Sequence, residues 1–155
     1  MGNKQKGFSL IELLIVVAII LIIAAIAIPN LMRSKMAANE ASAVASLRTL
    51  NTSIVAYQTT YATDPSTLAS LGPSATPSST AADLVDSLLG TDPAQKSGYT
   101  ITYTAVAGTP ITQYTILAAP QSTSTGQRRF FTDQSGVIRQ TTDGTTPTAS
   151  STPIG

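Results

Sequence analysis

The sequence predicts an α+β fold in which a long N-terminal α-helix packs on a small antiparallel β-sheet of three to four strands. Three observations predict it. Residues 8–29 form an unbroken apolar run, residues 30–61 carry apolar side chains at helical spacing, and residues 99–140 alternate apolar and polar side chains as half-buried strands do. A chain of 155 residues has room for one compact domain and one membrane-length segment.

The apolar run at residues 8–29 is long enough to cross a membrane. At about 1.5 Å per residue, some twenty residues span the hydrocarbon core of a bilayer. A cleaved secretory signal peptide also begins with basic residues such as Lys4 and Lys6, but its apolar core is shorter, at about 7–15 residues. A plain membrane anchor is the other explanation, and neither of them accounts for the one carboxylate in the run, Glu12.

Glu12 needs a partner in apolar surroundings. An acidic side chain costs about 2.5–3.5 kcal/mol at the centre of a membrane and less towards its edge. The run contains no lysine or arginine, so the partner is either a lipid headgroup or a group on another copy of the chain. If the chain were cut between Gly7 and Phe8, the new α-amino group would lie about one helical turn before Glu12. A copy displaced by that turn could place its amine against this carboxylate.

The sequence GFSLIE at residues 7–12 resembles the processing and assembly motif of type IV pilins and of the related pseudopilins of type II secretion. In that family a short basic leader, here with Lys4 and Lys6, ends at a glycine that matches Gly7. The first mature residue is aromatic and becomes N-methylated, which matches Phe8, and a glutamate at mature position five matches Glu12. The resemblance is strong over about residues 4–35 and holds only in outline beyond them.

The resemblance implies a pilin-like fold and a defined set of partners. A prepilin peptidase and methyltransferase would remove residues 1–7, and an assembly platform would move subunits from inner-membrane lipid into a helical homo-oligomer. The subunit would lie in the inner membrane before assembly, and in an extracellular pilus or a periplasmic pseudopilus afterwards. Pro29 matches a proline common in these helices; because proline lacks an N–H, we expect a kink or a local unwinding there. Without the leader, seven basic and eight acidic residues remain.

The helix is expected to continue over residues 30–61 as an amphipathic segment that packs on the sheet. Counted over residues 8–61, it would be about 80 Å long. Its apolar stripe repeats at three- and four-residue spacings, with Glu40 falling in the one wider gap. The stripe consists of Met36, Ala43, Leu47, Leu50, Ile54, Tyr57 and Tyr61.

Residues 62–98 are rich in Pro, Ser, Thr and Gly and are predicted to be a connecting loop that carries one short helix. Ser79 or Thr80 would cap this helix and Gly90 would end it. Strands are then predicted at residues 99–106 and 113–120, followed by a hairpin with its turn at residues 133–136. The Thr, Ser, Pro and Gly content of residues 141–155 favours a flexible tail.

Composition and spacing offer little for catalysis. The chain has no cysteine and no histidine, which excludes disulfides, thiol catalysis and histidine acid/base chemistry. Asp83 and Asp86 fit a solvated face better than an acid/base pair, no serine or threonine has a basic partner, and no basic face indicates a specific nucleic-acid site. We therefore expect no enzyme activity.

Asp133 is the one candidate metal ligand. The family's secretion pseudopilins bind calcium near the C-terminal end of their sheet, and calcium takes six to eight oxygen ligands. Asp133 and Asp143 are isolated in the sequence, so an ordinary turn explains Asp133 better. We expect no cofactor, with calcium as the alternative.

Three functions follow from these observations. The first is a structural subunit of a type IV pilus filament, and the second is the major pseudopilin of a type II secretion system that exports proteins. The third is a membrane-anchored binding module that works as a monomer. The absence of cysteine departs from pilins with a C-terminal disulfide and fits pseudopilins, whereas the lack of an evident calcium cluster favours a pilin. The sequence therefore predicts a pilus subunit, with the pseudopilin as the alternative.

Overall fold

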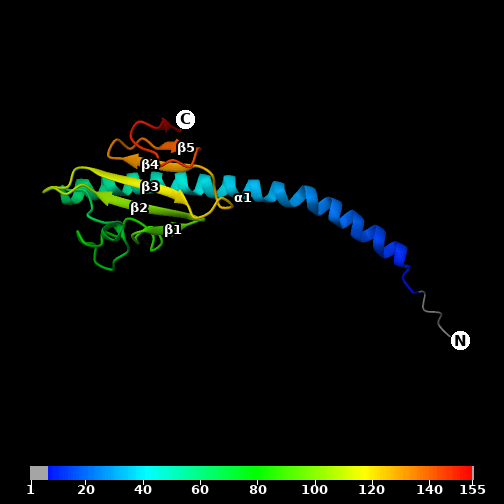
Figure 1. Ribbon diagram of the computed structural model, residues 1–155. Coiled ribbons are helices and arrows are strands. Elements are labelled where there is room, and N and C mark those ends of the chain that lie inside the picture. Colours follow the sequence, from blue (N-terminus) through cyan, green and yellow to red (C-terminus); the bar gives the residue numbers. More distant parts are fainter. Residues whose placement is uncertain (1–6, 155) are drawn as a thin grey trace. The chain divides into compact units, whose positions relative to one another are not determined.

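The computed structural model describes residues 7–154, which form one long α-helix, one short 3₁₀-helix and a six-stranded sheet (Figure 1). The helix α1 covers Leu10–Tyr61. The chain divides into two compact units, Met1–Lys35 and Met36–Gly155, so that α1 contributes to both. They are called the N-terminal unit and the C-terminal unit below, and each is described separately.

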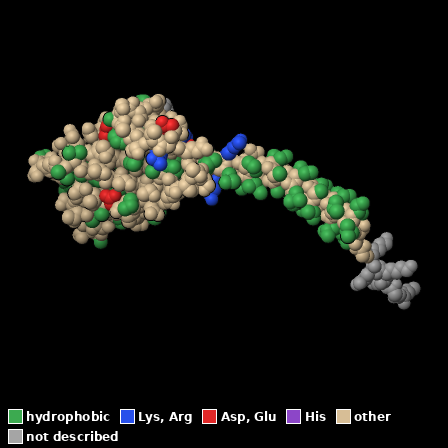
Figure 2. Space-filling model, viewed as in Figure 1, with side chains coloured by type: hydrophobic (Ala, Val, Ile, Leu, Met, Phe, Trp, Pro, Cys, Tyr) green, Lys and Arg blue, Asp and Glu red, His purple; other side chains and the backbone are tan. Residues whose placement is uncertain are grey.

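The described part of the N-terminal unit is a bare apolar helix. None of the residues in its most apolar 18-residue window is buried, and the helix is long and apolar enough to cross a membrane. Hydrophobic side chains cover the face seen in Figure 2. The α-helix runs through Pro29 without interruption, so the local unwinding expected as one of two possibilities there is not observed.

The C-terminal unit has one hydrophobic core between α1 and the sheet. The predicted stripe on α1 is confirmed, although Met36 and Tyr61 at its two ends are only partly buried. Glu40 lies in the same buried face. The fully buried apolar residues of this face are Ala43, Leu47, Leu50, Ile54 and Tyr57.

The sheet is an antiparallel meander in which each strand pairs with the next one along the chain. Its central pair, β2 at Tyr99–Ala105 and β3 at Tyr114–Pro120, is joined over its full length. The other strands are β1 at Ala94–Lys96, β4 at Arg129–Asp133, β5 at Arg139–Thr141 and β6 at Thr152–Pro153. The antiparallel sheet is confirmed, but the expected count of three to four strands is too low, because strands as short as β1 and β6 show no alternation in the sequence.

The connection after α1 contains a different helix from the predicted one. A 3₁₀-helix, η1, covers Leu68–Leu71, and the helix expected from Ser79 or Thr80 to Gly90 is not formed. The N–H groups of Ala82 and Leu84 donate instead to the carbonyls of Ser70 and Leu71, both at 2.9 Å. Between them Asp83 has a left-handed backbone with φ of 54°, which ends any helix there. The first half of the segment therefore pairs with η1 and does not form helical hydrogen bonds.

The C-terminal residues are folded onto the sheet, unlike the flexible tail expected for residues 141–155. β6 pairs with β5 through Gln140 and Thr152, and the N–H of Ile154 donates to the carbonyl of Ile138 at 2.9 Å. Pro147 is fully buried beside Phe131 on the face of the sheet away from α1. Composition missed this packing because it depends on contacts with residues that are distant in the sequence.

Candidate functional site

The predicted cleavage bond lies in an exposed segment that precedes the first residue of α1. Gly7 and Phe8 are both exposed and have no regular secondary structure, and the Phe8 side chain is 79% accessible. No atom lies within 4 Å of the place that a Cβ on Gly7 would take. A peptidase could therefore reach the Gly7–Phe8 bond from solvent. The leader lysines Lys4 and Lys6 lie outside the described residues.

Glu12 is the third residue of α1 and has a partner at the helix start. Its Oε2 accepts a hydrogen bond from the backbone N–H of Ser9 at 2.9 Å, and the carbonyl of Ser9 accepts one from the N–H of Leu13 at 3.2 Å. Half of a capping box is thus formed, in which the glutamate at the third position satisfies an N–H that the helix leaves free. The carboxylate also lies at the positive end of the helix dipole.

This capping role was missed from the sequence, although a signal was present. Ser9 and Glu12 stand in the S-x-x-E spacing of a capping box. The hydrogen bond does not neutralise the charge, and no lysine or arginine among residues 7–154 forms an ion pair with Glu12. A cation for this carboxylate must therefore come from outside the described part of the chain.

The apolar surface of the first part of α1, on both sides of Glu12, extends all around the helix. Burying one such aliphatic side chain stabilises a complex by about 1.5–3 kcal/mol. Because this helix carries many of them, their combined burial would stabilise a complex strongly. Pro29 is exposed within this surface and, 17 residues beyond Glu12, is about 25 Å along the helix from it. The structure thus brings Gly7, Phe8 and Glu12 to one end and leaves Pro29 apart from them. The large exposed residues on this surface are Leu10, Ile11, Leu13, Leu14, Ile15, Val16, Val17, Ile19, Ile20, Leu21, Ile22, Ile23, Ile26, Ile28, Leu31 and Met32.

A second polar centre, at Glu40, lies within the C-terminal unit and fastens the loop before β4 to α1. The side chain of Glu40 is almost fully buried, with 8% of the residue exposed. Its Oε1 accepts the backbone N–H groups of Gln127 at 3.0 Å and Arg128 at 3.1 Å. Its Oε2 accepts the Nε of Arg128 at 2.7 Å. The Glu40 carboxylate therefore accepts three hydrogen bonds from two residues of the loop before β4.

The pKa of Glu40 reflects two opposing effects. Burial disfavours the charged form, but the hydrogen bonds from the backbone of Gln127 and from Arg128 outweigh it and hold the pKa below its ordinary value. The same guanidinium donates to Oε1 of Gln140 on β5 at 3.0 Å. The helical spacing predicts that Glu40 lies in the stripe, but it gives no sign of the partner of Glu40, which lies 88 residues further along the chain.

The loop beside this ion pair is also held by side chains of α1 and β2. The Asn39 amide donates to the carbonyl of Thr125 at 2.9 Å, and the Tyr99 hydroxyl donates to the carbonyl of Arg128 at 2.8 Å. A Cβ on Gly126 would lie 2.2 Å from that hydroxyl, so only glycine lets the loop approach Tyr99. The loop before β4 is thus fixed on α1 at the start of the C-terminal unit.

Asp133 lies in the predicted turn. Its Oδ1 accepts the N–H of Ser135 at 2.9 Å, and its carbonyl accepts the N–H of Gly136 at 2.9 Å, whose φ of 71° suits glycine. Asp143 is engaged separately, since its Oδ1 accepts both the N–H and the hydroxyl of Thr145. Within residues 7–154, no three carboxylate side chains come close enough together to hold a metal ion.

Comparisons with known proteins find similarity that includes the N-terminal part of the chain. Residues 2–28 match the family model described as the prokaryotic N-terminal methylation motif. The chain is 40% identical over 86 residues to the type IV wide pilus major component PilA4 of Thermus thermophilus, an alignment that covers 54% of this chain and 66% of the relative.

Two further relatives are secretion proteins. The chain is 32% identical over 72 residues to the type II secretion system core protein G of Dickeya chrysanthemi, covering 46% of this chain and 47% of the relative. It is 36% identical over 56 residues to the core protein G of Escherichia coli, and this alignment covers 36% of this chain and 39% of the relative. No solved structure matches the chain significantly.

The chain thus spans at most 66% of the length of each of these relatives. The match to the family model covers the part in which the structure presents Gly7, Phe8 and Glu12 at the start of a bare apolar helix. The motif match, the two kinds of relative and a long apolar helix on a small antiparallel sheet agree with one another. The chain belongs to the family of type IV pilins and type II secretion pseudopilins.

Proposed function

We propose that this protein is a structural subunit of a type IV pilus, cleaved after Gly7, N-methylated on Phe8 and polymerised through α1. The observation that carries the proposal is the apolar helix of residues 10–32, whose side chains are almost all exposed and which begins with an exposed cleavage segment and a carboxylate. Its role is structural rather than catalytic.

A bundle of copies can provide both apolar contacts for this helix and a partner for the Glu12 charge, whereas lipid alone provides only the apolar contacts. Lipid would cover the aliphatic side chains, but it leaves the charge on Glu12 without a partner in its apolar region. Cleavage creates an α-amino group on Phe8, directly before the residue whose N–H Glu12 already binds. A copy displaced by about one turn brings its amine to the second oxygen of Glu12. Because one axial offset forms this pair, it also sets the register between neighbouring helices.

Each stage of assembly would involve a different partner. A prepilin peptidase and methyltransferase would act on the exposed Gly7–Phe8 bond, and an inner-membrane assembly platform would receive the processed subunit from inner-membrane lipid. Copies of the same chain would then be the permanent partners, in an extracellular filament.

The major pseudopilin of a type II secretion system is the second candidate. It is supported by the similarity to the core protein G of two organisms and by the lack of cysteine, which leaves no disulfide in the C-terminal unit. The longer and more similar match to PilA4 supports the pilus.

Electron microscopy of filaments sheared from the cell surface tests the proposal. We expect filaments that contain this protein as their main component and that disappear when its gene is deleted. A deletion strain that keeps its filaments but fails to export proteins would identify the pseudopilin instead. Recovery of the protein only as a membrane monomer, from cells that do carry filaments, would contradict both.

A further inference from the structure

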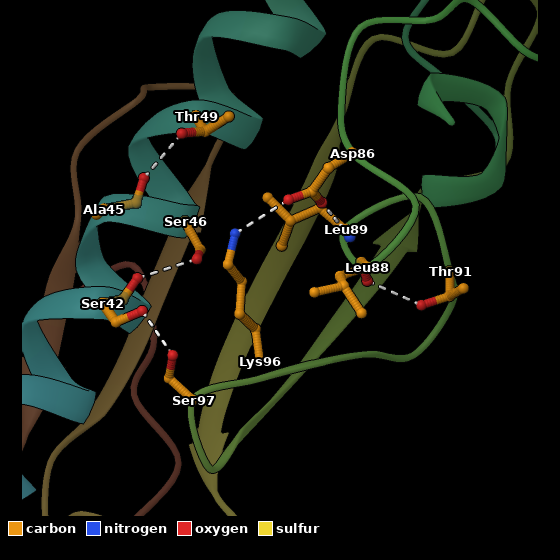
Figure 3. Close-up of polar contacts among 10 residues, drawn as sticks. All are labelled: Ser42, Ala45, Ser46, Thr49, Asp86, Leu88, Leu89, Thr91, Lys96 and Ser97. Carbon is orange, nitrogen blue, oxygen red and sulfur yellow. Dashed lines mark hydrogen bonds and ion pairs between the residues drawn. The ribbon is translucent and has the colours of Figure 1, made fainter. Parts of the chain in front are cut away.

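A groove of about 440 Å³ opens beside α1 in the C-terminal unit. One wall consists of small side chains of α1, and the other of residues 83–89 of the connection, with Lys96 of β1 at the edge. Figure 3 shows the side chain of Lys96, which belongs to β1, extending towards Asp86 of the connection. The side chains of the α1 wall are Ser42, Ala45, Ser46 and Thr49.

Most polar groups in this groove are already engaged. The Nζ of Lys96 lies 3.2 Å from Oδ2 of Asp86, and Oδ1 of Asp86 accepts the N–H of Leu89 at 2.8 Å. The hydroxyls of Ser46 and Thr49 donate to carbonyls of α1 one turn earlier, those of Ser42 and Ala45. These groups line the groove, but most of their hydrogen-bonding capacity is already used within the chain.

Asp83 is the exception. It is exposed and lines the groove, and its backbone is fixed by the hydrogen bond from its N–H to the carbonyl of Gly72 at 2.9 Å. Its carboxylate accepts no hydrogen bond and joins no ion pair among residues 7–154. With two carboxylates and one ammonium, the groove carries an uncompensated negative charge.

Two cations at the end of the apolar run form no ion pair within residues 7–154. Arg33 and Lys35 are exposed and belong to neither of the two ion pairs in the described structure. Lys and Arg side chains interrupt the hydrophobic surface there (Figure 2). When apolar helices bundle, these cations leave water or lipid headgroups, and an unpaired charge in such surroundings is costly. They then need carboxylates from other copies.

The remaining carboxylates of the C-terminal unit are less suited to this task. Glu40 is buried and paired with Arg128, Asp64 is buried, and Asp133 and Asp143 accept hydrogen bonds within their own turns. Asp92 is exposed but does not line the groove. Asp83 alone combines a free carboxylate with a concave surface beside small side chains.

We propose that this groove receives residues 33–35 of a second copy of the chain, with Asp83 binding one of their two cations. The small side chains on the α1 wall let another chain approach closely, and Lys96 already pairs with Asp86, which leaves the carboxylate of Asp83 for the incoming cation. The contact rests on the proposed filament and adds to it an electrostatic lateral interface that the apolar helices alone do not provide.

Cross-linking between two variants tests the contact in assembled filaments. The chain contains no cysteine, so cells can co-express an epitope-tagged Lys35→Cys copy with an untagged Asp83→Cys copy. A short bifunctional thiol reagent is needed, because an ion pair holds the Cβ atoms further apart than a disulfide allows. We expect a dimer that carries both copies, and such a dimer is intermolecular by construction. Asp143→Cys in place of Asp83→Cys is the matched control and should yield none.

Charge exchange tests the same contact without cross-linking. Asp83→Asn removes the charge and tolerates the left-handed backbone, and it should lower the salt concentration at which sheared filaments dissociate. Asp83→Lys should lower it further, and Lys35→Glu or Arg33→Glu in the same chain should restore it. Asp143→Lys should leave it unchanged.

The outcomes separate this inference from the proposed function. Filaments that form normally but give no mixed dimer, or an Asp83→Lys variant as salt-resistant as the parent, overturn the groove contact and leave the filament proposal intact. A parent chain that forms no filaments overturns both.

Discussion

Replacing Glu12 by glutamine is expected to reduce filament assembly strongly, while the subunit is still cleaved and still enters the membrane. Glutamine keeps the size of the side chain and an oxygen that can accept the N–H of Ser9, so the helix start is preserved. Only the charge that pairs with the amine of a neighbouring copy is lost. That amine would then be unpaired in an apolar bundle, where a lone charge costs several kcal/mol, so we expect assembly to fall by about tenfold or more.

The matching control separates charge from helix capping. Ser9→Pro removes the N–H that donates to Glu12 but leaves the carboxylate in place, and we expect filaments to persist. The measurement is the amount of protein in sheared filaments, normalised to the cleaved subunit in the membrane. Equal assembly of Glu12→Gln and the parent would show that the charge has no part in polymerisation.

Glu40→Ala is expected to destabilise the C-terminal unit by about 2–4 kcal/mol. The substitution leaves two backbone N–H groups, of Gln127 and Arg128, and one guanidinium without their acceptor. Lys96→Met is the matched control, since it breaks the other ion pair. The side chains of that pair, Lys96 and Asp86, are 32% and 50% exposed, compared with 10% for that of Glu40, so its loss should cost about 1 kcal/mol or less.

The same ion pair predicts how stability depends on pH. Because the pKa of Glu40 is lowered in the folded state, its contribution is present above the ordinary pKa of glutamic acid and is lost as the pH falls through the folded value. Denaturant unfolding of the full chain in detergent, followed by circular dichroism at neutral and acidic pH, measures both effects. Equal unfolding midpoints for Glu40→Ala and Lys96→Met at neutral pH would contradict the account.

The N-terminal features could be predicted because each depends on residues close together in the sequence. The glycine, the aromatic residue, the glutamate and the apolar run fall within one helix and its first turn, and the stripe from Ala43 to Tyr57 follows from helical spacing alone. Long strands such as β2 and β3 show their alternation for the same reason.

What could not be predicted depends on partners that are distant in the chain. The segment before Gly90 has apolar spacing and caps that favour a helix, yet Ala82 and Leu84 pair with η1 instead. Pro147 belongs to a segment whose composition resembles a linker, but it is buried against the sheet. Arg128 gives no sign in the sequence that it meets Glu40, and this ion pair fixes the loop before β4.

The mass of the subunit recovered from sheared filaments tests the central claim most directly. The proposed assembly depends on a free α-amino group at the start of the apolar helix, which pairs with the Glu12 carboxylate of a neighbouring copy. We predict a mature chain that begins at Phe8 and carries one methyl group on its α-amine, with Glu12 as its fifth residue. Filaments built from a chain that still begins at Met1 would contradict the account.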